Sequence, residues 1–294
     1  MSTANSPPVP APVSVPPFGW LHRALRHRSF VIGAVLSLLV VFAAALSLVW
    51  TPSSPYEMDL ANKLQGPSLA HWLGTDAFGR DVASLIMVGA RNSILVGVIA
   101  VGIGLTVGTA LGLLAAAKRG WVEELVMRLA DFTFAFPALL LASMRTAGWG
   151  AGIINSIIAI GIFYIPTFAR VTRASANAVW GREYILAARA CGKSTWRITL
   201  EHVLPNILSV LIVQITIQFA LAILAEAALS YLGLGTQPPQ PSWGRMLSEA
   251  QTLMFQAPLL AVWPGVAIAL AVLGLNLVGA GLRALLGPRL SRKR

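Results

Sequence analysis

Long apolar segments alternate with short polar segments along this chain of 294 residues. About 20 apolar residues in a helix are enough to cross the hydrocarbon core of a bilayer. The pattern therefore predicts an all-α integral membrane protein with six transmembrane helices. The six predicted spans are Phe30–Trp50, Ser93–Ala117, Leu125–Met144, Ile153–Phe168, Ile207–Leu232 and Pro258–Leu282.

The polar segments divide the chain into regions. Residues 1–19 are rich in proline, serine and alanine and are predicted to be a disordered cytoplasmic tail. Residues 20–50 are a basic segment with the first span, 51–92 an extracytoplasmic segment, 93–285 the core transmembrane domain, and 286–294 a basic cytoplasmic tail. A cleaved signal peptide is the alternative for the first span, with Ala43–Ala45 as the cleavage site. The apolar run exceeds the 7–15 residues of a signal core, which favours an uncleaved span.

Composition agrees with a membrane protein, since 56% of the residues are hydrophobic and only 11% are charged. A soluble enzyme of average composition has about 25% charged residues. The single cysteine, Cys191, excludes an intrachain disulfide.

The net charge of +11 raises the alternative of nucleic-acid binding, but the distribution of the charge argues against it. Of the 22 lysines and arginines, 17 fall in segments that six spans would place on one side. The positive-inside rule makes that side cytoplasmic. Both termini and residues 182–206 are therefore predicted to be cytoplasmic, and nucleic acid is not an expected partner.

Residues 182–206, here called the elbow, form the longest polar interruption in the second half of the chain. Glu183–Ala190 has strong helix formers, and Gly192 is placed to cap that helix with a positive φ. Ser194 or Thr195 then caps a second short helix through Leu200.

Pro205 suits the first turn of the next span, so it is predicted to close the elbow. Such a unit is too polar for lipid-exposed hydrocarbon, which places it on one membrane face as a docking surface.

The residues Gly192–Ser194 resemble the end of a phosphate-binding loop, but Ala187 occupies the position of the first glycine and helix formers precede it. Nucleotide binding by this chain is therefore not expected.

A stripe of small residues marks one face of the second span, at four-residue intervals. It allows another helix to approach closely. Its members are Ala100, Gly104, Gly108 and Gly112.

Two ionisable residues lie within the predicted spans and are candidates by default, because charge is expensive there. Glu226 either makes a structural hydrogen bond to a neighbouring helix or provides a polar point on a substrate path. Asp131 either lies at the interface, or pairs with Arg128 at i, i+3, or is functional. The Asp/Glu/His relay of a proton-driven transporter is missing.

The segments on the extracytoplasmic side carry further candidates. Asp76, Arg80 and Asp81 are predicted to form a hydrogen-bonded turn, with a catalytic carboxylate pair as the alternative. The segment 233–256 is predicted to be a rigid loop that exposes Trp243; a tryptophan of the interfacial belt is the alternative. Gln237, Pro238 and Pro239 belong to the same loop.

Three motifs together resemble the binding-protein-dependent ABC importer permeases. The elbow is similar to the EAA loop of that family, H-W-L-G-T-D-x-x-G-R-D occurs at 71–81, and L-G-L-G-x-Q-P-P-x-P-S-W-G occurs at 232–244. The second and third motifs are typical of the dipeptide, oligopeptide and nickel type. Leu186 replaces a frequent acidic residue, and Ala280 and Gly287 replace aspartates of many relatives.

The resemblance implies a type I ABC importer permease fold and a C-type subunit that forms half of a heterodimeric pore. It implies a homologous second permease subunit, two ABC ATPase subunits that hold ATP and Mg²⁺, an extracytoplasmic solute-binding protein facing the 233–256 loop, and a bacterial cytoplasmic (inner) membrane location. This chain would hold no cofactor and no metal. The residues implied to couple to the ATPase are Glu183, Tyr184, Ala187, Ala188, Arg189, Gly192 and Pro205.

The implied substrates are di- or oligopeptides, with a nickel chelate or another small solute as the alternative. An ion-coupled secondary transporter is a further alternative. A membrane-embedded enzyme finds no support, because the four histidines, His22, His27, His71 and His202, show no metal-ligand pattern.

Overall fold

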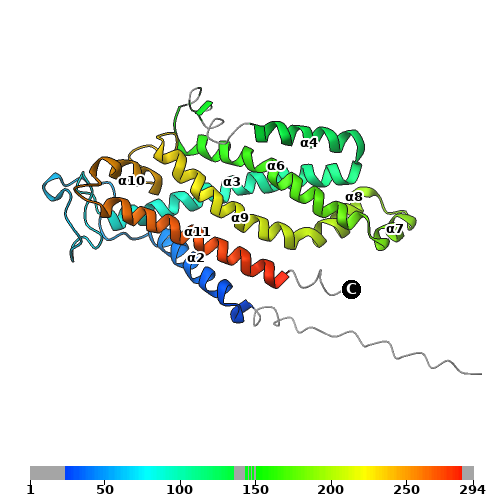
Figure 1. The fold of residues 1–294 in the computed structure, drawn as a ribbon, viewed down its shortest axis with the longest axis horizontal. Helices are drawn as coiled ribbons and strands as arrows, with labels where there is room; N and C mark the ends of the chain where they lie inside the picture. The colour runs from blue at the N-terminus through cyan, green and yellow to red at the C-terminus, as the bar shows by residue number, and fades with distance from the viewer. Residues whose placement is uncertain (1–23, 136–142, 145, 147, 149, 287–294) are drawn as a thin grey trace, which may run out of the picture.

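The structure, a computed structural model, describes residues 24–135, 143–144, 146, 148 and 150–286. This part of the chain is helical apart from its connections and one isolated β-bridge between Thr75 and Asp81. The helices are α2 (Arg28–Leu46), η1 (Leu60–Asn62), α3 (Val82–Lys118), α4 (Gly120–Ala135), α6 (Ile153–Trp180), α7 (Glu183–Ala190), α8 (Thr195–Ile198), η2 (Thr199–Val203), α9 (Leu204–Tyr231), α10 (Trp243–Ala250), η3 (Gln251–Leu253) and α11 (Leu259–Leu286) (Figure 1).

Five helices of the described residues are long and apolar enough to cross a membrane. They correspond to the first, second, fourth, fifth and sixth predicted spans. The third predicted span, Leu125–Met144, coincides with α4 only as far as Ala135. Its next residues, with Pro137, lie outside the described residues, as do the predicted 1–19 tail and residues 287–294 of the basic tail.

Helices α3 and α6 extend well beyond the predicted spans. Helix α3 begins at Val82 rather than Ser93, because the Asp81 carboxylate accepts a hydrogen bond from the backbone N–H of Ser84 and caps the helix. Helix α6 continues past Phe168 to Trp180. Both extensions carry polar side chains, so hydropathy alone places the boundary of the apolar segment and not the end of the helix.

Among the described residues, helices α3 and α6 share the most extensive contact of any pair of helices, along the predicted stripe of small residues. A Cβ added at Gly108 would lie 2.5 Å from the carbonyl oxygen of Ile165, and one added at Gly112 would lie 2.5 Å from that of Ala169. At Gly104 the added atom would lie 2.6 Å from the Tyr164 Cβ. The predicted close approach is present, and its partner is α6.

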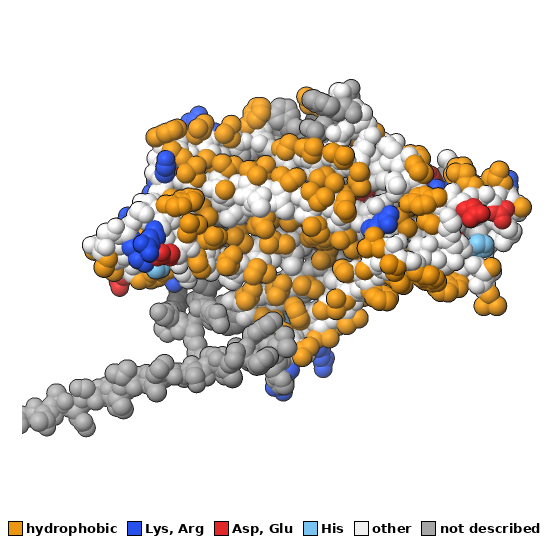
Figure 2. Space-filling model, turned by 180° about the vertical axis from the view of Figure 1, so that it is seen from behind, with side chains coloured by type: hydrophobic (Ala, Val, Ile, Leu, Met, Phe, Trp, Pro, Cys, Tyr) orange, Lys and Arg blue, Asp and Glu red, His pale blue; other side chains and the backbone are white. Residues whose placement is uncertain are grey.

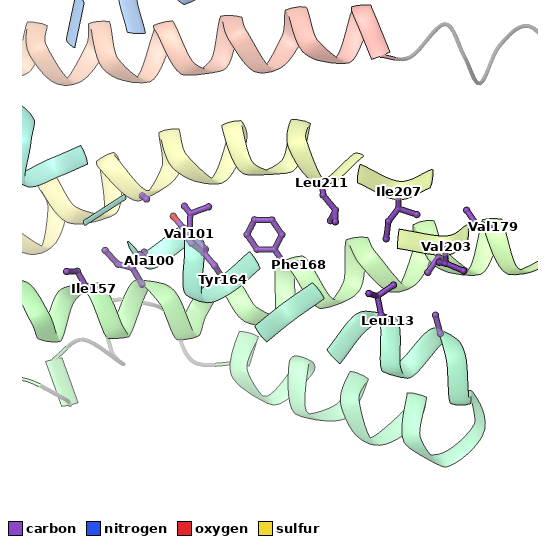
Figure 3. Close-up of a cluster of buried hydrophobic side chains, with 14 of the residues drawn as sticks. Ala100, Val101, Leu113, Ile157, Tyr164, Phe168, Val179, Val203, Ile207 and Leu211 are labelled. Carbon is purple, nitrogen blue, oxygen red and sulfur yellow. The ribbon is translucent and has the colours of Figure 1, made fainter. Parts of the chain in front are cut away.

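Helix α9 packs against both α3 and α6 and closes a buried apolar cluster between the three helices. Figure 3 shows Phe168 of α6 in this cluster, with Leu211 and Ile207 contributed from the α9 side and Val101 from α3. The ring of Phe168 is fully buried. Helix α11 packs on α9, and α2 packs on α11.

Glycines also bring α2 and α11 together. A Cβ added at Gly33 of α2 would lie 2.6 Å from the backbone nitrogen of Val278, and one at Gly281 of α11 would lie 2.6 Å from the Phe30 Cβ. Small residues thus allow close approach at two separate helix pairs, as expected where lipid supplies no hydrophobic driving force between helices.

The surface agrees with insertion in a membrane. Figure 2 shows hydrophobic side chains covering the middle of the visible face, while most charged side chains gather at its two ends. Helices α7 and α8 lie at one end of the molecule and α10 lies at the other (Figure 1). The elbow and the 233–256 segment are therefore at opposite ends, as the predicted topology requires.

The contact between α3 and α6 can be tested with a pair of glycine variants. Gly108→Leu is expected to lower the stability of the subunit by about 1–3 kcal/mol, because the new side chain meets the α6 backbone. In Gly102→Leu the added Cβ meets no heavy atom within 4 Å, so the control is expected to unfold near the wild-type temperature. Thermal unfolding of the subunit in detergent measures the stability of both variants. Equal melting temperatures for the two variants would contradict the close packing of α3 on α6.

Candidate functional site

The elbow joins α6 to α9 and folds as two short helices around a glycine turn. Helix α7 spans the predicted Glu183–Ala190, and Gly192 follows it with φ of +81°. The Gly192 N–H donates to the Arg189 carbonyl at 2.9 Å, and the Lys193 N–H donates to the Ala188 carbonyl at 3.2 Å. These two bonds satisfy carbonyls at the end of α7, which is the role predicted for the glycine.

Helix α8 begins where predicted but does not end where predicted. The Ser194 hydroxyl accepts a hydrogen bond from the Arg197 N–H and caps the helix. The predicted end at Leu200 is wrong, because Thr195 to Tyr231 is one continuous helix that includes a π-helical segment, Thr199–Val203. Pro205 lacks an N–H and would crowd the carbonyl of the preceding turn, and the wider π turn accommodates it.

A cluster of charged side chains fixes the glycine turn against η2, the π-helical segment that precedes α9. The Glu201 carboxylate accepts hydrogen bonds from Lys193 Nζ at 2.7 Å and from Arg197 Nε at 2.6 Å. Lys193 Nζ also lies 3.2 Å from His202 Nε2, and the His202 ring packs edge-on against Tyr184 of α7. These contacts connect α7, the turn, α8 and η2, so the elbow is braced as a unit.

The elbow has a buried side and an exposed side. Ile185 and Ile198 are fully buried and anchor the two short helices to the core. Leu186 and Trp196 are 59% and 63% exposed, and Tyr184 is also exposed. Apolar side chains on a polar unit outside the spans are typical of a protein interface.

The other elbow residues implied by the resemblance lie on or beside this exposed side. Glu183, Ala187 and Arg189 are exposed, and Ala188 is partly buried. The Arg189 guanidinium stacks 4.9 Å from the centre of the Trp180 ring at the end of α6. Lys193 of the apparent phosphate loop is used in the ion pair with Glu201, and no strand precedes it among the described residues.

Glu226 is fully buried and hydrogen-bonded. Its carboxylate accepts from the Ser93 hydroxyl of α3 at 2.8 Å and from the Ser230 hydroxyl at 2.7 Å, and Thr236 Oγ1 lies 3.4 Å away. Ser230 Oγ also accepts from the Thr236 N–H at 3.0 Å. The hydrogen bond to a neighbouring helix, one of the two alternatives, is therefore present, and the network ties α3, α9 and the start of the 233–256 segment together.

The predicted partner of Asp131 is wrong. Arg128 pairs with Glu124 one turn before it, with Nε 3.0 Å from Oε1. Asp131 instead pairs with Arg170 of α6, and the Arg170 guanidinium stacks on the Phe134 ring. Because Arg170 comes from a facing helix 39 residues away, helical spacing could not reveal it.

The predicted exposure of Trp243 is wrong as well. The side chain is 1% exposed, and its Nε1 donates to the Ile86 carbonyl of α3 at 3.0 Å. The ring lies over Gly89, where an added Cβ would be 2.7 Å from the indole Cδ1. The space left by Gly89 and the hydrogen bond to the Ile86 carbonyl thus hold the ring in the interior instead of at the bilayer interface.

Segment 233–256 is not only a loop, because it contains α10. Ser242 caps the helix, and Gly244 lies so close to α9 that an added Cβ would be 1.9 Å from the Ala227 carbonyl oxygen. The Gln237 amide donates to the carbonyls of Gly233 and Gly235 and orders the proline-rich part, with Pro238 and Pro239 following it. The helix could have been found from the capping serine and from Arg245 and Glu249 at i, i+4, which form an ion pair.

The predicted turn between Asp76 and Asp81 is present. The Asp76 carboxylate accepts from the N–H groups of Phe78 and Arg80, both at 2.8 Å, and pairs with the Arg80 side chain. The Asp81 carboxylate caps α3 and lies 3.1 Å from His71 Nδ1. Both carboxylates are occupied by structural bonds, which favours the turn over a catalytic pair.

Residues 51–80 and α10 are further joined by a contact that sequence reasoning missed. Arg80 pairs with Glu249 at 3.2 Å as well as with Asp76.

Within the described part of the chain, no group of three or more His, Cys, Asp or Glu side chains could hold a metal ion.

Comparison with known proteins agrees with this architecture. The profile of the family described as "Binding-protein-dependent transport system inner membrane component" matches residues 108–292. The chain is 40% identical to a glutathione transport system permease protein of Pectobacterium atrosepticum, over 92% of this chain and 90% of that protein. It is 40% identical to a dipeptide transport system permease protein of Alkalihalophilus pseudofirmus, over 97% of this chain and 94% of that protein.

One solved structure supports the fold. The inward-facing MetNI methionine ABC transporter matches with a TM-score of 0.57 and 17% identity, and the match covers 68% of this chain and 96% of that one. The fold is that of a type I ABC importer permease. From the family match and the two curated relatives together, the chain belongs to the binding-protein-dependent transport system inner membrane components, the permease subunits of ABC importers.

Proposed function

We propose that this chain is one of two permease subunits of an ATP-driven importer and forms half of the pathway for di- or oligopeptides across the bacterial inner membrane. The observation that carries the coupling role is the braced elbow, which exposes apolar side chains and is covalently joined to α6 and α9. Peptide is the substrate class because the curated relatives, 40% identical over nearly the whole chain, are named for glutathione and dipeptide transport.

The mechanism is alternating access driven by partner subunits. Two ABC ATPase subunits hold ATP and Mg²⁺, and their closure moves the exposed side of α7 and α8. Because the charged cluster around Glu201 braces the glycine turn, the elbow moves as a unit. The movement tilts α6 and α9 as rigid rods, together with α3, which packs on both.

The remaining partners follow from the same arrangement. A homologous second permease subunit completes the pathway, and an extracytoplasmic solute-binding protein delivers the peptide at the end that carries α10. Both termini and the elbow are cytoplasmic, since 17 of the 22 basic residues then lie on that side. Lipid covers the apolar middle of the surface, and no nucleic acid is involved.

Coupling is tested by adding bulk to the exposed turn. Gly192→Trp is expected to lower ATP-dependent peptide uptake at least tenfold, because a tryptophan at this open position projects from the surface that meets the ATPase. Gly120→Trp is the matched control, since Gly120 also has a positive φ and open space but is the first residue of α4, outside the elbow. Uptake and ATPase stimulation are measured in complexes that contain all subunits, and unchanged transport by Gly192→Trp would rule out this role of the turn.

The orientation is tested with the single cysteine of the chain. Cys191 is exposed in the elbow, so a membrane-impermeant maleimide is expected to label it in inside-out vesicles and not in intact cells. In a Cys191→Ser background, Val49→Cys, at an exposed position after α2, is expected to show the reverse pattern. Labelling of Cys191 from outside intact cells would overturn the topology.

A further inference from the structure

The outer end of α3 borders a polar hollow of about 250 Å³. One wall consists of residues 47–51, which follow α2, with Tyr56 beside them. The other wall is formed by Val88 and Arg91 of α3. The hollow is open to the surroundings of the protein and is separate from the elbow, at the other end of α3 from the turn into α4.

Arg91 brings a positive charge to this hollow that no other described residue neutralises. The other two described arginines at this end, Arg80 and Arg245, both form ion pairs with Glu249. The Arg91 side chain makes no ion pair and no hydrogen bond to any residue that the structure describes. An arginine at the edge of a membrane with no protein partner is free to bind an anion.

The positive charge of Arg91 is not needed to cap the C-terminal end of α2 either. The carbonyl groups at the end of a helix lack intrahelical partners and attract cations. Here the carbonyls of residues 43, 45 and 46 accept from the N–H groups of Ser47, Leu48, Val49 and Trp50, and the Ala44 carbonyl accepts from the Ser47 hydroxyl. Capping of α2 therefore does not account for Arg91.

The depth of Arg91 matches the headgroup region of a bilayer. Helix α3 is 37 residues long, and at 1.5 Å per residue it is about 55 Å long, far longer than the hydrocarbon core. Arg91 and Lys118 are 27 residues apart, which is about 40 Å along the helix. A bilayer measures about 40–45 Å with both headgroup layers, so Lys118 at the inner headgroups places Arg91 at the outer ones.

The rim of the hollow suits a lipid. Val49 is 85% exposed and Leu48 is also exposed, so both present apolar surface beside the charge. Trp50 and Tyr56 are aromatic residues of the kind that gathers at membrane interfaces. A free phosphate ion would gain nothing from these apolar and aromatic neighbours, whereas a phospholipid places its phosphate on the arginine and its acyl chains on the apolar rim.

We propose that the hollow between residues 47–51 and α3 binds the phosphate of an outer-leaflet phospholipid, with the Arg91 guanidinium donating hydrogen bonds to the phosphate oxygens. Guanidinium and phosphate form strong charge-assisted pairs. The bound lipid joins α2 to α3 at their outer ends. This role depends on membrane insertion and not on the transported substrate, so it is testable independently of peptide uptake.

The experiment uses the assembled transporter in detergent, titrated separately with dioleoyl phosphatidylethanolamine, with dioleoylglycerol, and with inorganic phosphate. Native mass spectrometry counts the phospholipid molecules retained, and thermal unfolding measures the stabilisation. We expect the phosphatidylethanolamine alone to raise the melting temperature of the wild-type complex. Full stabilisation by dioleoylglycerol, or by inorganic phosphate without lipid, would overturn the proposal.

Variants assign the effect to this hollow. Arg91→Gln is expected to weaken phosphatidylethanolamine binding about tenfold and to remove one retained lipid. Lys63→Gln is the control, because Lys63 is an exposed cation of the same extracytoplasmic segment away from the hollow. The Lys63→Gln complex is expected to bind phosphatidylethanolamine as tightly as the wild type does.

A second variant keeps Arg91 and does not disturb the interior. Val49→Asp places a carboxylate at an exposed position of the hollow, where it repels the phosphate and pairs with Arg91. It is expected to lose the same lipid with a normal fold. If Val49→Asp retains the lipid as the wild type does, or if a folded Arg91→Gln complex does so, the site does not exist.

Discussion

The contact of two helix backbones at Gly108 and Gly112 is the constraint on which the rest of the fold depends. In a bilayer, apolar side chains gain little by leaving lipid for protein, so helices associate through close packing. Helices α3 and α6 pack closely because glycines leave one face of α3 without side chains. Helix α9 then packs on both, and the elbow that joins α6 to α9 is held at one end of this three-helix unit.

At the end of this three-helix unit that is remote from the elbow, buried hydrogen bonds hold the helices together. In the middle of the unit, close packing at glycines does so. The buried Glu226 carboxylate links α3 to α9, and the Trp243 indole donates back to α3 from the start of α10. A buried carboxylate is tolerated only where hydrogen bonds satisfy it, and the hydroxyls of Ser93 and Ser230 do so here. The 233–256 segment is therefore fixed to α3 and α9 by hydrogen bonds.

Sequence reasoning found the features that depend on local chemistry. Five of the six predicted spans, the α7 helix, the Gly192 turn and the α3 stripe all follow from apolar runs, helix propensity and the absence of a side chain. It failed where a distant residue decides the outcome. Asp131 forms its ion pair with Arg170 and not with the predicted Arg128, and Trp243 is buried because it packs into the space left at Gly89. It also placed helix ends at changes of polarity, although α3 and α6 continue through polar residues.

The π turn at Thr199–Val203 has a mechanical consequence. Since it replaces a break with a slightly wider coil, α8, the π turn and α9 form one continuous helix of 37 residues, about 55 Å along its axis. When such a helix tilts about a point near its centre, the tip next to α10 moves in the direction opposite to the tip in the elbow. Because Gly244 lets α10 pack closely on α9 at Ala227, α10 moves together with that tip.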